Sequence, residues 1–467
     1  MIVAKAPDRR LFYGSEELHR PALTNFYVRL NAVVGHWGTL CAPLAQAFHG
    51  QKNGRPVDPT VYFKIFLVGY IEGIVYDTDL AERIGDSFAI REFVGYGPTE
   101  RTPDHSSLSR VRARLGQSGQ LELLMDRIVQ KCIEAGLVSG AEVAADSTLV
   151  PANASLSSLQ SVTTGISVND HFKRLREEDK KLTVSNEEFR STSDPDARIA
   201  KKGSSCPKGM YYKVTHVTDA KAQVILSAQV ETADISDPEA AIAPLEETKQ
   251  RLESGLITLG TVVCDAGYDD SQFHARVEAM GATPLTNYTR PASPKPEGFA
   301  KKDFVYDAER DLYICPNGKL VRHSCKEGDR IHYKAWQSDC AECPFKALCL
   351  AKNTKQRSIK RAQNEAAKER NAARCHTEDS REKLKRRKVV VEPPFGHLKR
   401  FGGLKLVNCR TKKRTQVKIT IAAIGWNLLK LVKNLGPDLI LALVRSILGQ
   451  RSRRYCVTMH STCIAIA

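Results

Sequence analysis

The stretch Gly140-Ala-Glu-Val-Ala-Ala-Asp-Ser-Thr-Leu-Val150 is the one from which the rest of the chain can be interpreted. Its small and β-branched residues are typical of a buried strand, and Asp146 is the carboxylate at the end of the apolar run. Burying an unpaired carboxylate costs free energy, so such a residue usually lies at the mouth of a site with a partner or a metal ion. We therefore expect Asp146 in a functional site, and the alternative is that it caps the following helix.

A second strand pattern of the same kind follows in Leu259-Gly-Thr-Val-Val-Cys-Asp-Ala-Gly-Tyr268. The Val-rich run ends in Asp265 and then breaks at a glycine, as strands of an α/β sheet do at their functional edge. A helix cap is again the alternative for Asp265 taken alone. Two strand-end aspartates together predict a shared site.

A third acidic residue stands in the basic segment Arg386-Arg-Lys-Val-Val-Val-Glu-Pro-Pro-Phe-Gly-His-Leu-Lys-Arg-Phe-Gly-Gly403. Its two prolines disfavour helical geometry at Glu392 and allow a helix that begins just after it. Lys399 then falls on the same face two turns later. The alternative for Glu392 is an ordinary carboxylate favoured by the dipole at a helix start.

The positive charge of the chain is concentrated in one segment. The formal net charge is +17, and residues 351–433 alone hold 24 basic and 6 acidic residues, so the remainder is nearly neutral. Such a local surplus indicates a nucleic-acid-facing surface, because each phosphate contact releases counterions. A solvated charged helix is the alternative.

Residues 1–13 are mixed and charged without an apolar core, so we expect no secretion signal. The thirteen cysteines are an odd number, and several have apolar neighbours, which favours a reducing compartment over a disulfide framework. The apolar run Leu439–Val444 is too short to cross a bilayer, so we expect no membrane partner.

Periodicity predicts helices over residues 23–135, and Asp104 is a good cap for a helix that carries Arg110, Arg112 and Arg114 towards phosphate. A plain helical bundle is the alternative for this region. The polar stretch after Asp146, up to about Gly209, is predicted to be a long loop or excursion. Then come a hairpin (210–218 with 223–231), helices (239–252 and 271–280) and strands (259–264 and 282–285), a mixed α/β sheet.

The cysteine-rich segment combines Cys315-Pro-Asn-Gly-Lys with Cys340-Ala-Glu-Cys343 and Cys349. Thiolates on a tight turn can occupy neighbouring corners of a zinc tetrahedron, so the spacing predicts a zinc site formed by Cys315, Cys340, Cys343 and Cys349. Cys325 or His323 could replace one ligand, and reduced thiols without metal are the alternative. Thr415 to Leu435 is predicted as a long apolar helix that packs on the sheet.

The motifs around Asp146, Asp265 and Glu392 together resemble the bacterial insertion-sequence DDE transposases with an InsH-type N-terminal domain. The match spans most of the chain, and the segments Arg55 to Gly73 and Pro103 to Arg110 resemble that N-terminal domain. One departure concerns the family signature Tyr-x-x-Arg-x-x-x-Glu-x(6)-Lys. Lys385 and Lys388 occupy its Tyr and Arg positions, and with the prolines we expect no continuous helix through the signature.

The resemblance implies an α/β fold, in which an RNase H-like mixed-sheet catalytic domain is combined with a helical N-terminal DNA-binding domain and a cysteine-rich insertion. The implied divisions are 1–135 for the N-terminal domain, 136–290 and 383–435 for the catalytic domain, 291–382 for the insertion and 436–467 for a tail.

The resemblance also implies catalysis by Asp146, Asp265 and Glu392, which would bind two Mg²⁺ or Mn²⁺ ions. The substrate would be double-stranded DNA, bound as a homodimer or higher oligomer at a bacterial cytoplasmic, nucleoid-associated location. The DNA-contacting residues implied are Lys399, Lys388, Arg400 and Arg110. Two other functions remain open: a structure-specific nuclease on the same fold, and a non-catalytic, zinc-containing DNA-binding regulator.

Overall fold

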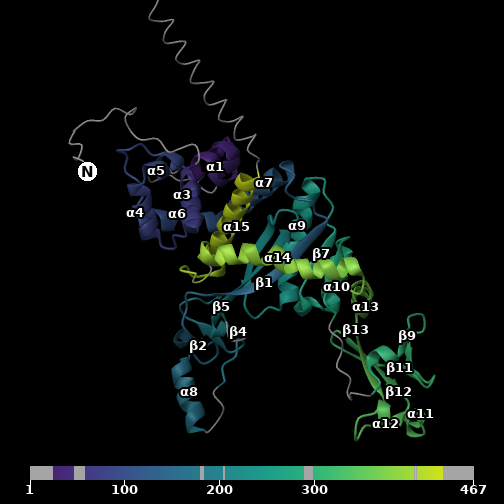
Figure 1. The fold of residues 1–467 in the computed structure, drawn as a ribbon. Helices are drawn as coiled ribbons and strands as arrows, with labels where there is room; N and C mark the ends of the chain where they lie inside the picture. Colours follow the sequence, from purple (N-terminus) through teal and green to yellow (C-terminus); the bar gives the residue numbers. More distant parts are fainter. Residues whose placement is uncertain are drawn as a thin grey trace, which may run out of the picture. The chain divides into compact units, whose positions relative to one another are not determined.

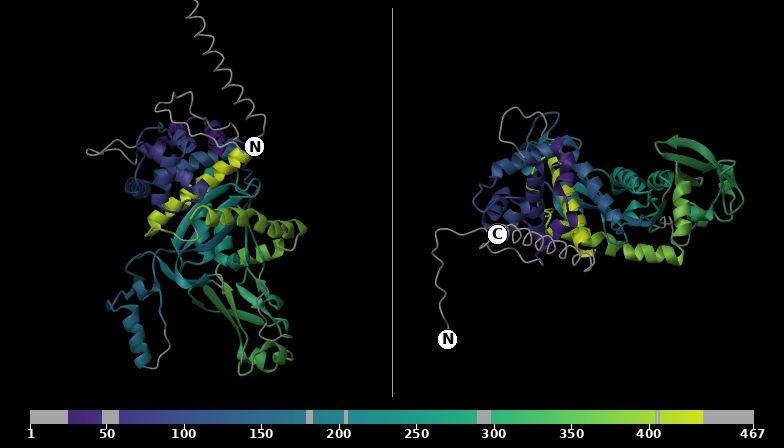
Figure 2. Two further views of the ribbon diagram at one scale, coloured as in Figure 1. Left: turned by 60° about the vertical axis from the view of Figure 1, so that its left-hand side comes forward. Right: turned by 90° about the horizontal axis from the view of Figure 1, so that it is seen from above.

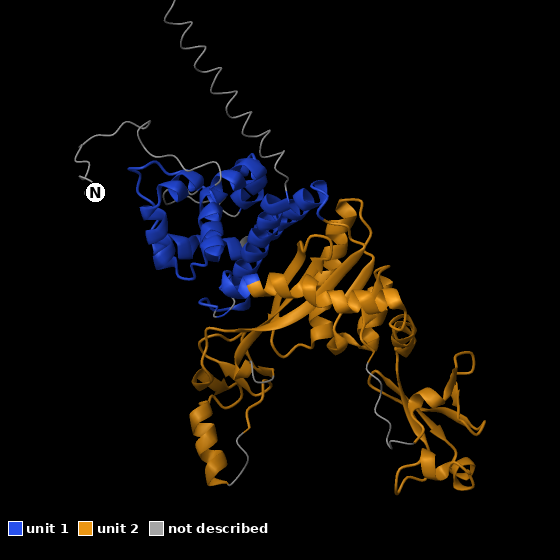
Figure 3. Cartoon of the chain, viewed as in Figure 1, with its two compact units in different colours: residues 1–137, 397–467 blue, residues 138–396 orange. Residues whose placement is uncertain are grey.

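The structure is a computed structural model of the chain. It describes residues 25–46, 58–178, 183–202, 206–288, 298–403, 405 and 407–434. The chain divides into two compact units, coloured separately in Figure 3. Unit 1 comprises residues 1–137 and 397–467, and unit 2 comprises residues 138–396. The expected tail, 436–467, lies outside the described residues.

Unit 1 is helical, as predicted. Asp58 and Asp104 each cap the start of a helix, because their carboxylates accept hydrogen bonds from backbone amides of the first turn. Thr60 N donates to Asp58 at 2.8 Å, and Ser107 N donates to Asp104 at 2.7 Å. The helices are α1 (Phe26–Val34), α2 (Trp37–Ala45), α3 (Pro59–Glu72), α4 (Asp77–Asp86), α5 (Phe88–Val94), α6 (His105–Ser118), α7 (Gln120–Glu134) and α15 (Lys412–Asn434).

Helix α15 packs in unit 1, against α1, α3, α6 and α7. The prediction that this helix covers the sheet was therefore wrong. Its close approach to α3 depends on Gly425, where a Cβ atom would overlap the ring of Tyr70. An apolar helix pattern predicts burial, and here the partners are other helices.

Unit 2 is built on a mixed sheet, confirming the predicted α/β class (Figure 1). Its central strands lie in the order β6-β5-β1-β7-β8, and β4 also pairs with β5. The pairs β6/β5 and β5/β1 are antiparallel, whereas β1/β7 and β7/β8 are parallel, which is the RNase H-like arrangement. The strands are β1 (Glu142–Pro151), β4 (Arg198–Lys202), β5 (Cys206–Asp219), β6 (Ile225–Thr232), β7 (Thr261–Cys264) and β8 (Thr283–Thr286).

Three further helices of unit 2 accompany this sheet: α9 (Asp237–Ser254), α10 (Ser271–Ala279) and α13 (Glu365–Arg374). Between β1 and β4, the predicted long loop in fact contains several short elements. Serine side chains help to order it, as in the 2.7 Å contact between Ser158 Oγ and Ser191 Oγ. The elements are η2 (Leu156–Ser158), β2 (Leu159–Ser161), α8 (Val168–Glu177) and β3 (Phe189–Ser191).

The cysteine-rich insertion forms a second, five-stranded antiparallel sheet in the order β13-β12-β11-β10-β9. Tyr313, Val321 and Tyr333 are in its own small core. The elements are η4 (Lys301–Asp303), β9 (Val305–Asp307), β10 (Leu312–Ile314), β11 (Leu320–Glu327), β12 (Arg330–Ala335), α11 (Gln337–Ala341), α12 (Lys346–Cys349) and β13 (Ser358–Ala362).

Helix α14 (Glu378–Arg400) is continuous through Pro393 and Pro394 and lies along the sheet (Figure 1 and Figure 2). The expectation that a helix begins only after Glu392 was wrong. The buried side chains of Val390, Val391 and Phe395 pack against Ala144 of β1. This burial favours one unbroken helix despite the prolines.

Candidate active site

The backbone of the sheet places Asp146 and Asp265 at the same level. Strands β1 and β7 pair in parallel, and the last matched pair is Ala144 with Val263. Asp146 and Asp265 each lie two residues beyond that pair. Asp146 is not at the end of its strand, because β1 continues to Pro151 alongside β5. It lies where the parallel neighbour ends, and this opens the sheet edge at its side chain.

Asp146 is partly buried, with 23 % of its side chain exposed. Its carboxylate accepts hydrogen bonds from the amide of Ser147 (2.8 Å) and from Arg387 Nη1 on α14 (3.1 Å). Burial raises the pKa of Asp146 and the nearby Asp265 carboxylate raises it further, whereas Arg387 and the Ser147 amide oppose the shift. The two aspartates are therefore electrostatically coupled.

Asp265 begins a 3-10 turn, η3 (Ala266–Tyr268), and its Oδ1 accepts a hydrogen bond from Gly267 N at 2.8 Å. The capping alternative thus applies to one of its oxygens. It does not apply to Asp146, which lies inside a strand.

A buried polar layer joins the two aspartate motifs. The hydroxyl of Ser147 lies 2.7 Å from Tyr268 Oη and 2.8 Å from Thr215 Oγ1. Ser147 follows Asp146 directly, and Tyr268 ends the turn that Asp265 begins. Sequence reasoning did not assign these residues a role; their closeness to the aspartates was the available signal.

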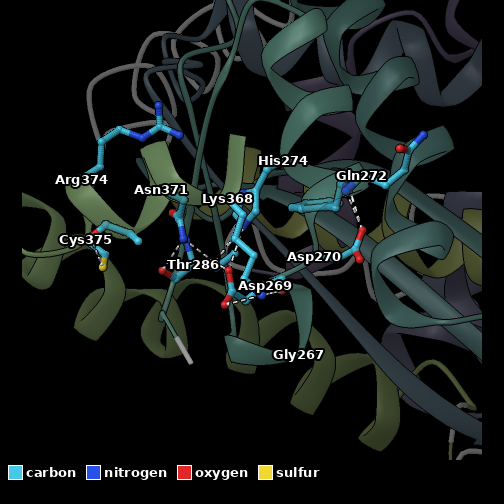
Figure 4. A network of polar contacts seen from close by, with 12 residues as sticks. Gly267, Asp269, Asp270, Gln272, His274, Thr286, Lys368, Asn371, Arg374 and Cys375 are labelled. Atoms are coloured by element: carbon cyan, nitrogen blue, oxygen red, sulfur yellow. Dashed lines mark hydrogen bonds and ion pairs between the residues drawn. The ribbon is translucent and has the colours of Figure 1, made fainter. Parts of the chain in front are cut away.

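A second network of polar contacts, shown in Figure 4, fixes the position of the segment after Asp265. Asp269 has a nearly buried carboxylate, which lies 3.1 Å from His274 Nε2 and 3.1 Å from Lys368 Nζ of α13. Lys368 also donates to the Asp269 carbonyl at 2.7 Å. Asn371 of α13 binds the backbone of Thr286 at the end of β8. Helix α13 therefore holds both the Asp265 segment and the end of β8.

Glu392 is exposed on α14. Because an α-helix turns about 100° per residue, the continuous helix places Lys385, Lys388, Glu392 and Lys399 on one side. Among the residues that the structure describes, no three or more His, Cys, Asp or Glu side chains form a group that could hold a metal ion. The structure thus brings Asp146 and Asp265 together, and it does not bring Glu392 into the same group.

Two arginines of α14 that sequence reasoning did not place in the site contact β1. Arg387 pairs with Asp146, and Arg386 pairs with the buried Glu142. The signature had directed attention to positions 385 and 388, which are exposed. Val390 and Val391, which follow these arginines by one helical turn and pack against β1, determine which basic residues face the strand.

The DNA-contact candidates differ in exposure. Arg110 is exposed on α6, and its Nη2 donates to Ser107 Oγ at 3.1 Å. Arg112 is mostly buried and paired with Asp77 at 2.6 Å, so it is not available to phosphate. Lys388 and Arg400 are exposed, and Lys399 is half-buried. Their contacts with DNA remain predictions.

The four predicted zinc ligands lie in one neighbourhood. The pKa of the Cys349 thiol is raised, and the largest cause is burial. Arg357 opposes this shift, whereas the nearby thiols of Cys340, Cys343 and Cys315 add to it. Cys315 begins a tight turn in which Lys319 N donates to its Sγ at 3.3 Å. The described thiols do not form a closed metal-binding group, so zinc remains a prediction. Among the described residues, no hydrogen bond joins Cys325 or His323 to these four cysteines.

No helix within the described ranges is both long and apolar enough to span a membrane. Within the same ranges, the cysteines are free thiols.

Two segments of the chain match family models of transposase domains. Residues 16–114 match the model of a transposase domain, DUF772, and residues 314–432 match that of a transposase DDE domain, which includes Glu392. No curated protein matches the chain.

A solved structure, the cryo-EM synaptic complex of the piggyBac transposase with hairpin DNA, is similar at 11 % identity, covering 91 % of this chain and 82 % of that one. The TM-score of this similarity is 0.31. The two matches occur in the order that the motifs predict: a transposase domain comes first, and a transposase DDE domain follows it.

Proposed function

We propose that this transposase binds the terminal inverted repeats of an insertion sequence and catalyses metal-dependent strand cleavage and strand transfer into target DNA. The observation that carries the proposal is the pairing of β1 with β7, which sets Asp146 and Asp265 at one level of the sheet edge. The alternatives remain a nuclease that only cuts and a regulator that only binds.

The chemistry of the site fits a divalent metal. Carboxylate oxygens are the ligands that Mg²⁺ and Mn²⁺ prefer. The Asp265 carboxylate disfavours the charged form of Asp146, and a cation relieves that repulsion. Asp146, Asp265 and Glu392 would hold the metal, as two ions per site. When bound, the ions would activate a water molecule or a DNA 3′-hydroxyl as the nucleophile and would neutralise negative charge on the leaving oxygen.

The chain's own residues prepare this site. Arg387 compensates the charge of Asp146, and the Ser147–Tyr268 contact fixes the Asp265 turn relative to β1. Lys388, Lys399, Arg400 and Arg110 would bind DNA phosphate, in agreement with the basic surplus of residues 351–433. We infer a homodimer or higher oligomer on DNA, which light scattering of the complex tests.

The decisive experiment incubates the full chain with labelled transposon-end DNA, a target plasmid and Mg²⁺. Strand transfer joins the label to the plasmid, a nuclease yields only shortened DNA, and a regulator leaves the DNA intact but shifted on a gel. A chelator added before Mg²⁺ should abolish joining and leave binding. Cut products without joined ones would overturn the strand-transfer proposal.

We also propose one structural zinc ion held by Cys315, Cys340, Cys343 and Cys349. The tight turn at Cys315 and the shared neighbourhood of the thiols support it. Metal analysis of protein purified without added zinc should find about one equivalent per chain. Cys343→Ser should lose it, whereas Cys206→Ser, outside the insertion, should not. Folded protein without metal would leave these residues as ordinary thiols.

A further inference from the structure

Helix α14 contains two interior prolines, and the first of them leaves a backbone carbonyl without its usual helical partner. A helical residue normally donates its N–H to the carbonyl four residues earlier, so Pro393 leaves the carbonyl of Val389 without its helical donor. The proline ring also clashes with that carbonyl and pushes it outward. An uncompensated interior proline kinks or breaks a helix, and here the break would fall one residue from Glu392.

The missing donor comes from another part of unit 2. Gln223 Nε2 donates to the carbonyl oxygen of Val389 at 2.8 Å. Gln223 lies in the turn between β5 and β6 and has a φ of 60°, in the left-handed region that non-glycine residues seldom adopt. The turn thus holds an unfavourable backbone conformation at the residue whose side chain reaches α14.

The turn is itself anchored to the start of β1. The carboxylate of Asp219 is buried and accepts hydrogen bonds from the amides of Gly140 (2.8 Å), Lys221 (2.9 Å) and Ser139 (3.1 Å). The backbone N–H of Gln223 donates to the backbone carbonyl of Asp219 at 3.1 Å. The backbone of Gln223 is therefore linked through Asp219 to the segment that leads into β1, the strand that carries Asp146.

A second contact holds α14 on the other side of Glu392. The ring of Phe395 stacks on His216, with centroids 4.2 Å apart and an interplanar angle of 7°. His216 is buried in β5 and is the register partner of Asp146. Val389 lies three residues before Glu392 and Phe395 three after it, so the helix is fixed on both sides of the glutamate.

We propose that Gln223 is a positioning residue of the active site, which supplies the hydrogen bond that Pro393 cannot make and so fixes the Glu392 segment of α14 against β1. The inference rests on the proposed function, because it assumes that Glu392 takes part in the reaction. His216 and Phe395 act with it as the second fixed point.

A double-mutant cycle tests this role. Gln223→Met keeps a long unbranched side chain and removes the donor, whereas Pro393→Ala restores the helical N–H to Val389. The readouts are kcat and KM for Mg²⁺-dependent cleavage of transposon-end DNA, and the free energy of unfolding in urea. Gln250→Met, at an exposed glutamine of α9, is the matched control.

Gln223→Met should lower kcat about five- to tenfold, the cost of one hydrogen bond, and leave KM within about twofold. In the Pro393→Ala background the same change should alter kcat less than about twofold, because Val389 then has a helical donor. Equal losses in both backgrounds in an active enzyme would overturn the positioning role alone. A wild-type chain that neither cuts nor joins DNA would overturn the proposed function, and the role of Gln223 with it.

Discussion

The corner formed by β1 and β7 and the Glu392 segment of α14 contribute to the same proposed site in different ways. Strand pairing sets the level of Asp146 and Asp265, and it is maintained by a ladder of backbone hydrogen bonds. Glu392 depends on how one helix packs, through a few buried side chains and the side-chain hydrogen bonds made by Gln223, Arg386 and Arg387. The backbone therefore sets the positions of Asp146 and Asp265, whereas side-chain contacts fix the helix segment that carries Glu392.

The largest expected effect breaks the backbone-placed pair. Asp146→Asn and Asp265→Asn keep the side-chain shape and remove the charge that binds metal, so cleavage and joining should each fall at least about a thousandfold. Binding to transposon-end DNA should be retained, as a gel-shift titration can show. Glu309→Gln, an exposed change in the insertion, controls for lost charge. Near-normal reaction rates in both variants would favour the regulator function.

Glu392→Gln tests the helix-placed carboxylate. It should reduce cleavage and joining by a similar factor, while the free energy of unfolding changes by less than about 0.5 kcal/mol because the side chain is exposed. Single-turnover assays and urea unfolding measure the two effects. If both aspartate variants lost activity and Glu392→Gln did not, the third metal ligand would be another residue. Glu378, Asp379 and Glu382 are the acidic residues nearest to Glu392 in the sequence.

The link between the two regions can be broken at Arg387. Arg387→Gln leaves the partly buried Asp146 without its ionic partner, so the free energy of unfolding should fall by about 1–3 kcal/mol. Lys388→Gln, the exposed neighbour, should cost less than about 0.5 kcal/mol. Urea unfolding of both variants at pH 7 measures the difference. Equal effects would mean that the pair with Asp146 does not stabilise the fold.

The exposed side of α14 should affect DNA binding and not the fold. Replacing Lys388 and Arg400 by Gln should reduce the slope of log affinity against log salt by up to about two, since each phosphate contact contributes about 0.9. Fluorescence titrations with transposon-end DNA from low to physiological salt measure the slope. Glu382→Gln serves as the control. An unchanged slope would remove these two residues from the DNA interface.

Much of the fold followed from local pattern. The apolar runs before Asp146 and Asp265 are strands of one sheet, and Asp104 caps its helix as predicted. The polar stretch after β1 was misjudged, because serine hydrogen bonds and a few buried side chains order it without a periodic signal. The contact between Ser147 and Tyr268 was also missed, since it joins residues far apart in the sequence.

The sequence by itself determined that the N-terminal region is helical, that strands precede Asp146 and Asp265, the order of the three acidic motifs, and the likeness to a transposase family. The tertiary structure alone decided which side of α14 packs, why Arg387 and not Lys388 meets Asp146, and where α15 is buried. It also decided that α14 continues through its prolines. A proline removes a donor locally, and no neighbouring residue replaces it; the replacement, Gln223, becomes available only once the strand turn and the helix are packed together.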